Sequence, residues 1–154
     1  MKKFSNEVLS IEVRDGVVNQ LSHFIQREAK SLESGGILMG KRLYSGDIII
    51  TDITTPQKGD IRKRMYFKKK TKIHQKISDD IWAESKGRIT YVGEWHTHPE
   101  NIPTPSFVDI KGWELGVKKQ KNNKVYLFLI IGIREFGMWS YDEEHGLIQM
   151  ERIL

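Results

Sequence analysis

Apolar side chains recur along the chain at two different spacings, and the first is that of β-strands. Alternating or nearly continuous apolar runs predict strands at 8–13, 37–40, 47–53, 88–95, 125–133, 136–141 and 147–153, with a possible short strand at 65–67. The run at 125–133 (VYLFLIIGI) is apolar at almost every position. It therefore predicts a central strand that is buried on both faces.

The second spacing is that of amphipathic helices, and it occurs three times. The first helix is predicted from an N-cap at Asp15 to residue 32, where the run Glu-Ser-Gly-Gly ends it. The second is predicted over 73–87 and the third over 106–117. Because these helices alternate with strands, we expect one α/β domain over residues 1–154, with helices packed against the sheet.

Composition limits the chemistry that the chain can use. The 154 residues include no cysteine, which excludes disulfides, thiolate metal sites and a cysteine nucleophile. Any bound metal would need histidine, aspartate or glutamate. No long apolar run follows the basic start MKKF, and the run at 125–133 is too short to cross a bilayer as a helix. We expect a cytoplasmic protein that does not contact the membrane.

The net charge of +5 is concentrated in one segment, 58–72. It holds eight basic residues and one acid, a local charge of +7, so the rest of the chain sums to −2. The basic residues are Lys58, Arg62, Lys63, Arg64, Lys68, Lys69, Lys70 and Lys72. Such a patch suggests an acidic partner surface or a nucleic acid, and a solvated lysine-rich loop explains it equally well.

The segment GEWHTHPENIPTPSFVD, residues 93–109, carries the candidate chemistry. Side chains alternate along a strand, so His96 and His98 point the same way with their Cα atoms ~7 Å apart. Three prolines stiffen the loop that follows, and Asp109 lies one turn inside the next helix. If the loop folds back, two imidazoles and a carboxylate converge with a fourth position open, which is the pattern of a catalytic zinc site.

Each part of this segment also has a simpler interpretation. Ser106-x-x-Asp109 is a helix-capping pattern, and His96 and His98 alone could be surface residues. The combined spacing favours the metal site, and capping is compatible with it. A catalytic site also needs a base. Glu33, before two glycines that allow close backbone approach, and Glu94, on the same strand face as His96, are both candidates.

Three motifs resemble those of the JAMM (MPN+, Mov34/PAD-1) metallopeptidases. They are ESGGILMG at 33–40, HTHP at 96–99 and SFVD at 106–109, with seven residues between the second histidine and the serine. The resemblance implies a single JAMM/MPN-type domain, a mixed sheet flanked by about three helices, with the site at the end of a central strand and the following helix. It also implies one zinc ion held by His96, His98 and Asp109, Glu33 as general acid/base, and Ser106 stabilising the oxyanion.

The chain looks most like compact bacterial members of this family found in CBASS anti-phage operons. That resemblance implies hydrolysis of the amide between a C-terminal tail, from a ubiquitin-like protein or a nucleotidyltransferase, and a target lysine. Ubiquitin-transfer-like enzymes would then be partners. Other bacterial members trim the C-terminus of ubiquitin-like or sulfur-carrier precursors, and this remains an alternative.

The basic segment lies where family members carry an insertion that contacts the modifier protein. The resemblance therefore implies that Lys68, Lys69 and Lys70 bind the substrate. A non-catalytic scaffold is a second possibility, which the intact motifs disfavour. A nucleic-acid-binding module is a third, and the segment offers only Tyr66 and Phe67 for base stacking.

Five residues outside the motifs are also assigned an environment. His74 lies in a charged helix, so we expect it to be exposed. Trp82, Trp113 and Trp139 are expected to be core or interface aromatics. The side chain of Trp95 should face away from His96, because neighbours on a strand point to opposite faces.

Overall fold

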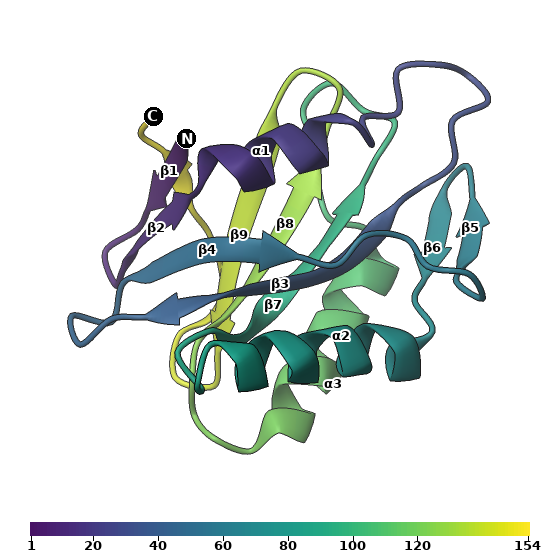
Figure 1. Ribbon diagram of the computed structural model, residues 1–154. Coiled ribbons are helices and arrows are strands. Elements are labelled where there is room, and N and C mark those ends of the chain that lie inside the picture. The colour runs from purple at the N-terminus through teal and green to yellow at the C-terminus, as the bar shows by residue number, and fades with distance from the viewer.

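A computed structural model describes all 154 residues as a strongly curved sheet, three helices and a separate hairpin (Figure 1). The sheet strands are β1 (Lys2–Ser5), β2 (Ser10–Val13), β3 (Gly35–Arg42), β4 (Ile48–Ile53), β7 (Thr90–Thr97), β8 (Tyr126–Ile131), β9 (Phe136–Asp142), β10 (Gly146–Gln149) and β11 (Glu151–Arg152). The helices are α1 (Asp15–Ser22), α2 (Thr71–Glu84) and α3 (Phe107–Gln120). The hairpin consists of β5 (Ile61–Lys63) and β6 (Tyr66–Lys68).

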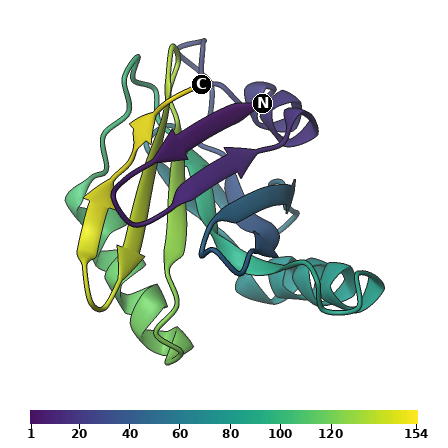
Figure 2. The ribbon, with the colours of Figure 1, turned by 90° about the vertical axis from the view of Figure 1, so that its left-hand side faces the viewer.

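The nine-stranded sheet is mixed and nearly closed on itself. Its strand order is β10-β9-β8-β7-β3-β4-β2-β1-β11, with β2–β4 and β7–β8 parallel and the other pairs antiparallel. Strands β10 and β11 are one C-terminal segment interrupted at Met150, whose N–H donates to the carbonyl of Met138 (2.8 Å). This segment pairs with β9 and then with β1, so it joins the two edges of the sheet (Figure 2).

Strand β8 is buried on both faces, as its continuous apolar sequence predicts. Leu127, Leu129 and Ile131 face the larger core, to which α1 contributes. The alternate residues of β8 face a second cluster, where Trp113 of α3 stacks on Phe128 with ring centroids 4.6 Å apart. The α/β class, the mixed sheet and the three helices are thus confirmed. None of the helices is both long and apolar enough to cross a membrane.

The first helix is shorter than its apolar pattern predicts. It ends at Ser22 instead of residue 32, although Phe24 and Ile25 continue to pack against the core. After Ser22 the chain is irregular, and the carbonyls of residues 29 and 31 accept hydrogen bonds from the side chains of Arg64 and Gln26 (2.9 and 3.2 Å). The first of these contacts ties the segment to a part of the chain 35 residues away.

One other expectation from the sequence was wrong. His74 is fully buried, not exposed, because Asp60 from the preceding loop provides a hydrogen-bond partner that helical periodicity does not reveal. Trp113 and Trp139 are buried, whereas Trp82 is 55% exposed, so of its two expected roles only that of an interface aromatic stays a prediction. Trp95 lies in the larger core and donates to the carbonyl of Thr54 (2.8 Å), on the face away from His96, as predicted.

Candidate metal centre

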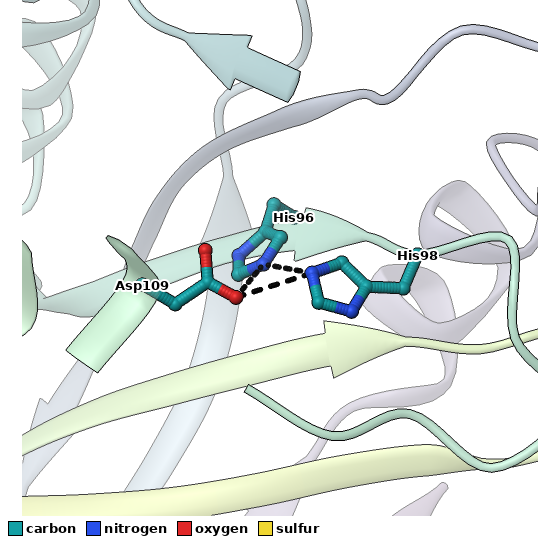
Figure 3. A group of neighbouring side chains, drawn as sticks. All are labelled: His96, His98 and Asp109. Carbon is teal, nitrogen blue, oxygen red and sulfur yellow. Dashed lines mark hydrogen bonds and ion pairs between the residues drawn. The ribbon is translucent and has the colours of Figure 1, made fainter. Parts of the chain in front are cut away.

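Two histidines and one aspartate converge at the end of β7 (Figure 3). The Nε2 atoms of His96 and His98 are 2.9 Å apart, and they lie 3.2 and 3.1 Å from Oδ2 of Asp109. His96 is the second-to-last residue of β7, His98 directly follows the strand, and Asp109 is in the first turn of α3. The structure therefore brings together the three residues that the spacing selects.

This donor set fits a zinc ion. Tetrahedral coordination at ~2.0 Å places neighbouring donor atoms ~3.3 Å apart, close to the separations observed here. The donors are two imidazole nitrogens and one carboxylate oxygen, which suit Zn²⁺ without a thiolate. All three side chains are partly exposed, so a fourth ligand can approach from solvent.

The start of α3 fixes the carboxylate of Asp109. Ser106 is the N-cap, and its Oγ accepts the N–H of Asp109 (3.0 Å). Oδ2 of Asp109 accepts the N–H of Ser106 in return (2.8 Å), which completes a capping box. The same Oδ2 faces both histidines, so the observed capping role of this motif is compatible with the proposed ligand role. The hydroxyl hydrogen of Ser106 remains available for a further acceptor.

Glu33 lies beside this cluster although it is distant in sequence. Its neighbour Ser34 accepts the N–H of Thr97, the residue between the two histidines (2.9 Å). The side chain is only 5% exposed, and this burial raises the pKa of Glu33 to about 7. Nearby His98 works against the shift, while Asp109 adds to it. A buried carboxyl whose pKa is near neutrality can exchange protons with a reacting group.

The glycines after Glu33 are needed for close packing. A Cβ on Gly35 would lie 2.5 Å from the ring of Phe67 in the hairpin, and a Cβ on Gly36 would lie 2.2 Å from the carbonyl of Thr54. Neither contact leaves room for a side chain. The Gly-Gly pair thus lets both the hairpin and β4 approach the base segment, as the sequence suggested.

The rival base, Glu94, is already occupied. Its carboxylate forms an ion pair with the ammonium of Lys69. This geometry favours Glu33 over Glu94 as the base. The three lysines assigned to substrate binding also differ from one another, because Lys69 is paired with Glu94 while Lys68 and Lys70 are exposed.

Glu100 is a residue of the site that the sequence analysis missed. Its Oε1 lies 2.8 Å from Nδ1 of His98 and leaves Nε2 facing Asp109. Burial opposes protonation of His98, but the hydrogen bonds to Asp109 and Glu100 outweigh it and raise the pKa of His98 to about 9 in the metal-free protein. A carboxylate on the second nitrogen of a ligand histidine commonly orients the ring. The sequence does carry a local signal for Glu100, since it is an acid two residues after the candidate ligand His98.

Comparisons with known proteins identify the family of this chain. The profile of the prokaryotic homologs of the JAB domain matches residues 17–143. A protein of Escherichia coli named CD-NTase/cGAS isopeptidase is 38% identical over 132 residues, which cover 86% of this chain and 80% of that protein. Its namesake from Vibrio cholerae serotype O1 is 34% identical over 132 residues, covering 86% and 81%.

The fold also matches solved structures. A protein from Desulfitobacterium hafniense, known from its solution structure, superimposes with a TM-score of 0.64 at 17% identity, covering 92% of this chain and 90% of that one. At this identity the likeness concerns the fold alone. The family profile and the relatives, taken together with the motif residues, show that the chain belongs to the prokaryotic homologs of the JAB domain.

Proposed function

We propose that this protein is a zinc-dependent isopeptidase that hydrolyses the amide between a C-terminal tail and the ε-amine of a target lysine. The observation that carries the proposal is the convergence of His96, His98 and Asp109 beside the buried carboxyl of Glu33. A structural metal site would have four protein ligands and no need for a buried base. The names of the relatives support the bond type.

In this mechanism, His96, His98 and Asp109 would hold the zinc, which supplies a Lewis acid for the scissile carbonyl and for the attacking water. Glu33 removes a proton from that water, which then adds to the carbonyl carbon. The hydroxyl of Ser106 donates to the oxygen that becomes negative. Glu33 returns the proton to the leaving lysine amine as the C–N bond breaks, giving a free carboxylate and a free amine.

The proposed substrate is a CD-NTase-type protein or a ubiquitin-like modifier joined to a lysine. The relatives are named for action on CD-NTase, which makes that conjugate the first to test. The exposed Lys68 and Lys70 would attract acidic groups on the tail or on the modifier. A linear precursor, trimmed at its C-terminus, would use the same chemistry, so the experiment must distinguish the two.

The test uses a variant, expressed in the native host, that should bind the conjugate without cutting it. Glu33→Gln keeps the side chain's size and removes the base, so conjugates should bind and remain uncut. Mass spectrometry of lysine-linked adducts would compare this strain with wild type and with Glu28→Gln, a matched change at an exposed glutamate. We expect adducts to accumulate only with Glu33→Gln, and the adduct's sequence would identify the tail. Accumulation of an untrimmed linear precursor would instead support the alternative, and no accumulation of either would contradict both.

A further inference from the structure

We propose that Gln26 is a positioning residue that sets the base segment against the metal ligands and connects both to the β5–β6 hairpin. Its effect on catalysis rests on the proposed isopeptidase function. Gln26 belongs to the irregular segment after α1 and is only 2% exposed. A buried primary amide must satisfy one acceptor and two donor groups within the protein.

All three hydrogen-bonding positions of Gln26 are used. Oε1 accepts the hydroxyl of Thr97 (2.7 Å), and Nε2 donates to the carbonyls of Ser31 (3.2 Å) and Arg64 (2.9 Å). The opposite orientation of the amide would set its oxygen against two carbonyl oxygens, so the network itself fixes the orientation. Gln26 therefore joins three segments that are 5, 38 and 71 residues away in sequence.

Thr97 connects Gln26 to the centre of the site. It lies between the two ligand histidines and is fully buried, with its side chain on the opposite face of β7. Its Oγ1 accepts the N–H of Ser34 (2.9 Å), while its own N–H donates to the carbonyl of Ser34 (2.9 Å). Ser34 directly follows Glu33. The Gln26–Thr97–Ser34 chain thus fixes the backbone of the base against the strand that carries the ligands.

The hairpin contacts the same base segment directly. The carbonyl of Lys63 accepts the N–H of Glu33 (2.7 Å). Arg62 donates from Nε to the carbonyl of Glu33 (3.0 Å) and from Nη2 to Oγ of Ser34 (2.7 Å). With the bond from Gln26 to Arg64, hairpin and base segment share one hydrogen-bonded network. A shift of the hairpin is therefore transmitted to the backbone that carries Glu33.

Two changes remove the network without altering side-chain size greatly. Gln26→Met removes all three bonds of the amide, and Thr97→Val removes the hydroxyl. Thr97→Ser retains it and is the matched control. We expect kcat on the conjugate to fall about 10- to 100-fold with the first two variants, because small misplacements of catalytic groups cost rates of this size. KM should stay within about twofold, zinc should remain at one ion per chain, and Thr97→Ser should restore kcat.

Hydrogen–deuterium exchange gives a readout that does not depend on activity. In Gln26→Met we expect faster exchange at 31–35 and 61–68, and unchanged exchange at 2–13, which lies outside the network. An unchanged kcat in both Gln26→Met and Thr97→Val would overturn the proposal, as would a uniform rise in exchange that includes 2–13. If wild type cuts no conjugate while the local exchange pattern appears, the isopeptidase function fails and the structural role of Gln26 stands.

Discussion

Two of the clusters of histidine and carboxylate in the protein differ in how their nitrogen and oxygen atoms are used. In the first, His96, His98 and Asp109 bring three ligand atoms together at a partly exposed point. In the second, His74 is fully buried, with Nδ1 lying 2.6 Å from Oγ1 of Thr54 and Nε2 donating to Asp60 (2.9 Å). The two clusters contain the same residue types, but they differ in which ring nitrogens already have a partner within the protein.

The difference shows what makes a histidine available to a metal. Both ring nitrogens of His74 are used by the protein, and Asp60 also accepts the backbone N–H groups of Gln57 and Lys70 (2.7 Å each). This cluster leaves no ring nitrogen for a metal, and its hydrogen bonds join Asp60, before the hairpin, to Lys70 and His74, after it. His98 uses one nitrogen for Glu100 and leaves the other facing the open point. A ligand cluster is thus recognised by its unused lone pairs.

The largest expected effect separates the two clusters directly. His96→Ala removes a ligand, so zinc should be lost and kcat/KM on the conjugate should fall at least ~10³-fold, since a metal Lewis acid contributes several kcal/mol. His74→Leu should retain one zinc per chain. Metal analysis and steady-state kinetics on both variants would check this. The assignment of the clusters is wrong if His74→Leu loses zinc while His96→Ala retains it.

Changing the base should come next. Glu33→Gln should lower kcat about 10²- to 10⁴-fold with zinc retained. Because burial raises the pKa of Glu33 to about 7, and the base acts as a carboxylate, wild-type kcat/KM should fall as the pH drops below that value. The positive charge of a bound ion would lower the pKa of Glu33, so the fall in kcat/KM would begin at a lower pH. A pH profile from 5 to 9 checks it, and a plateau that continues unchanged to pH 5 would contradict it.

The cluster around His74 should matter for stability and not for metal binding. His74→Leu leaves the buried carboxylate of Asp60 and the hydroxyl of Thr54 short of a partner, which should lower the free energy of unfolding by about 3 kcal/mol. Urea unfolding of the metal-free proteins measures this loss. His23→Leu, at an exposed histidine after α1, is the control and should change stability little. Equal losses in the two variants would refute a structural role for His74.

Glu100 should tune the metal centre without being a ligand. Glu100→Gln weakens the partner of His98 Nδ1, so zinc affinity should fall about 10- to 100-fold, as for other such supporting carboxylates. Chelator competition would measure the dissociation constant. Glu135→Gln, at another exposed glutamate, is the matched control. An unchanged zinc affinity would show that Glu100 does not support the site.

The smallest effect concerns the exposed lysines of the hairpin segment. Lys68→Glu with Lys70→Glu should raise KM several-fold and flatten its dependence on salt, with kcat little changed. Lys118→Glu with Lys119→Glu, in the last turn of α3, makes the same charge change elsewhere. An equal rise in KM in both double variants would indicate a general charge effect, and no rise in the first would remove these lysines from substrate binding.

The convergence of the three candidate ligands could be predicted from sequence because their geometry is local. Strand alternation places His96 and His98 on one side, and the capped start of α3 orients Asp109. The central strand was equally clear, since β8 is apolar throughout. The choice of Glu33 over Glu94 required the family resemblance, because Glu33 meets the histidines only through pairing of β3 with β7.

The network around the site could not be predicted from the sequence. Gln26 meets Thr97 across 71 residues, and no local pattern marks either residue as a partner. The segment after the early end of α1 is a second case, because its apolar period continues while the carbonyl of residue 29 accepts a hydrogen bond from Arg64. His74 also depends on a carboxylate outside its helix. Polar contacts between distant segments, not apolar periodicity, determine these features.

The most direct test of the account uses a defined conjugate in which a CD-NTase C-terminal tail is joined to the ε-amine of a lysine peptide. Intact mass spectrometry would follow its reaction with zinc-loaded wild type and with zinc-loaded Glu33→Gln. We predict that wild type releases the tail as a free carboxylate and the lysine peptide with its amine restored, while Glu33→Gln leaves the conjugate intact. A wild-type protein that holds one zinc ion and cuts neither this conjugate nor one made with a ubiquitin-like tail would contradict the account.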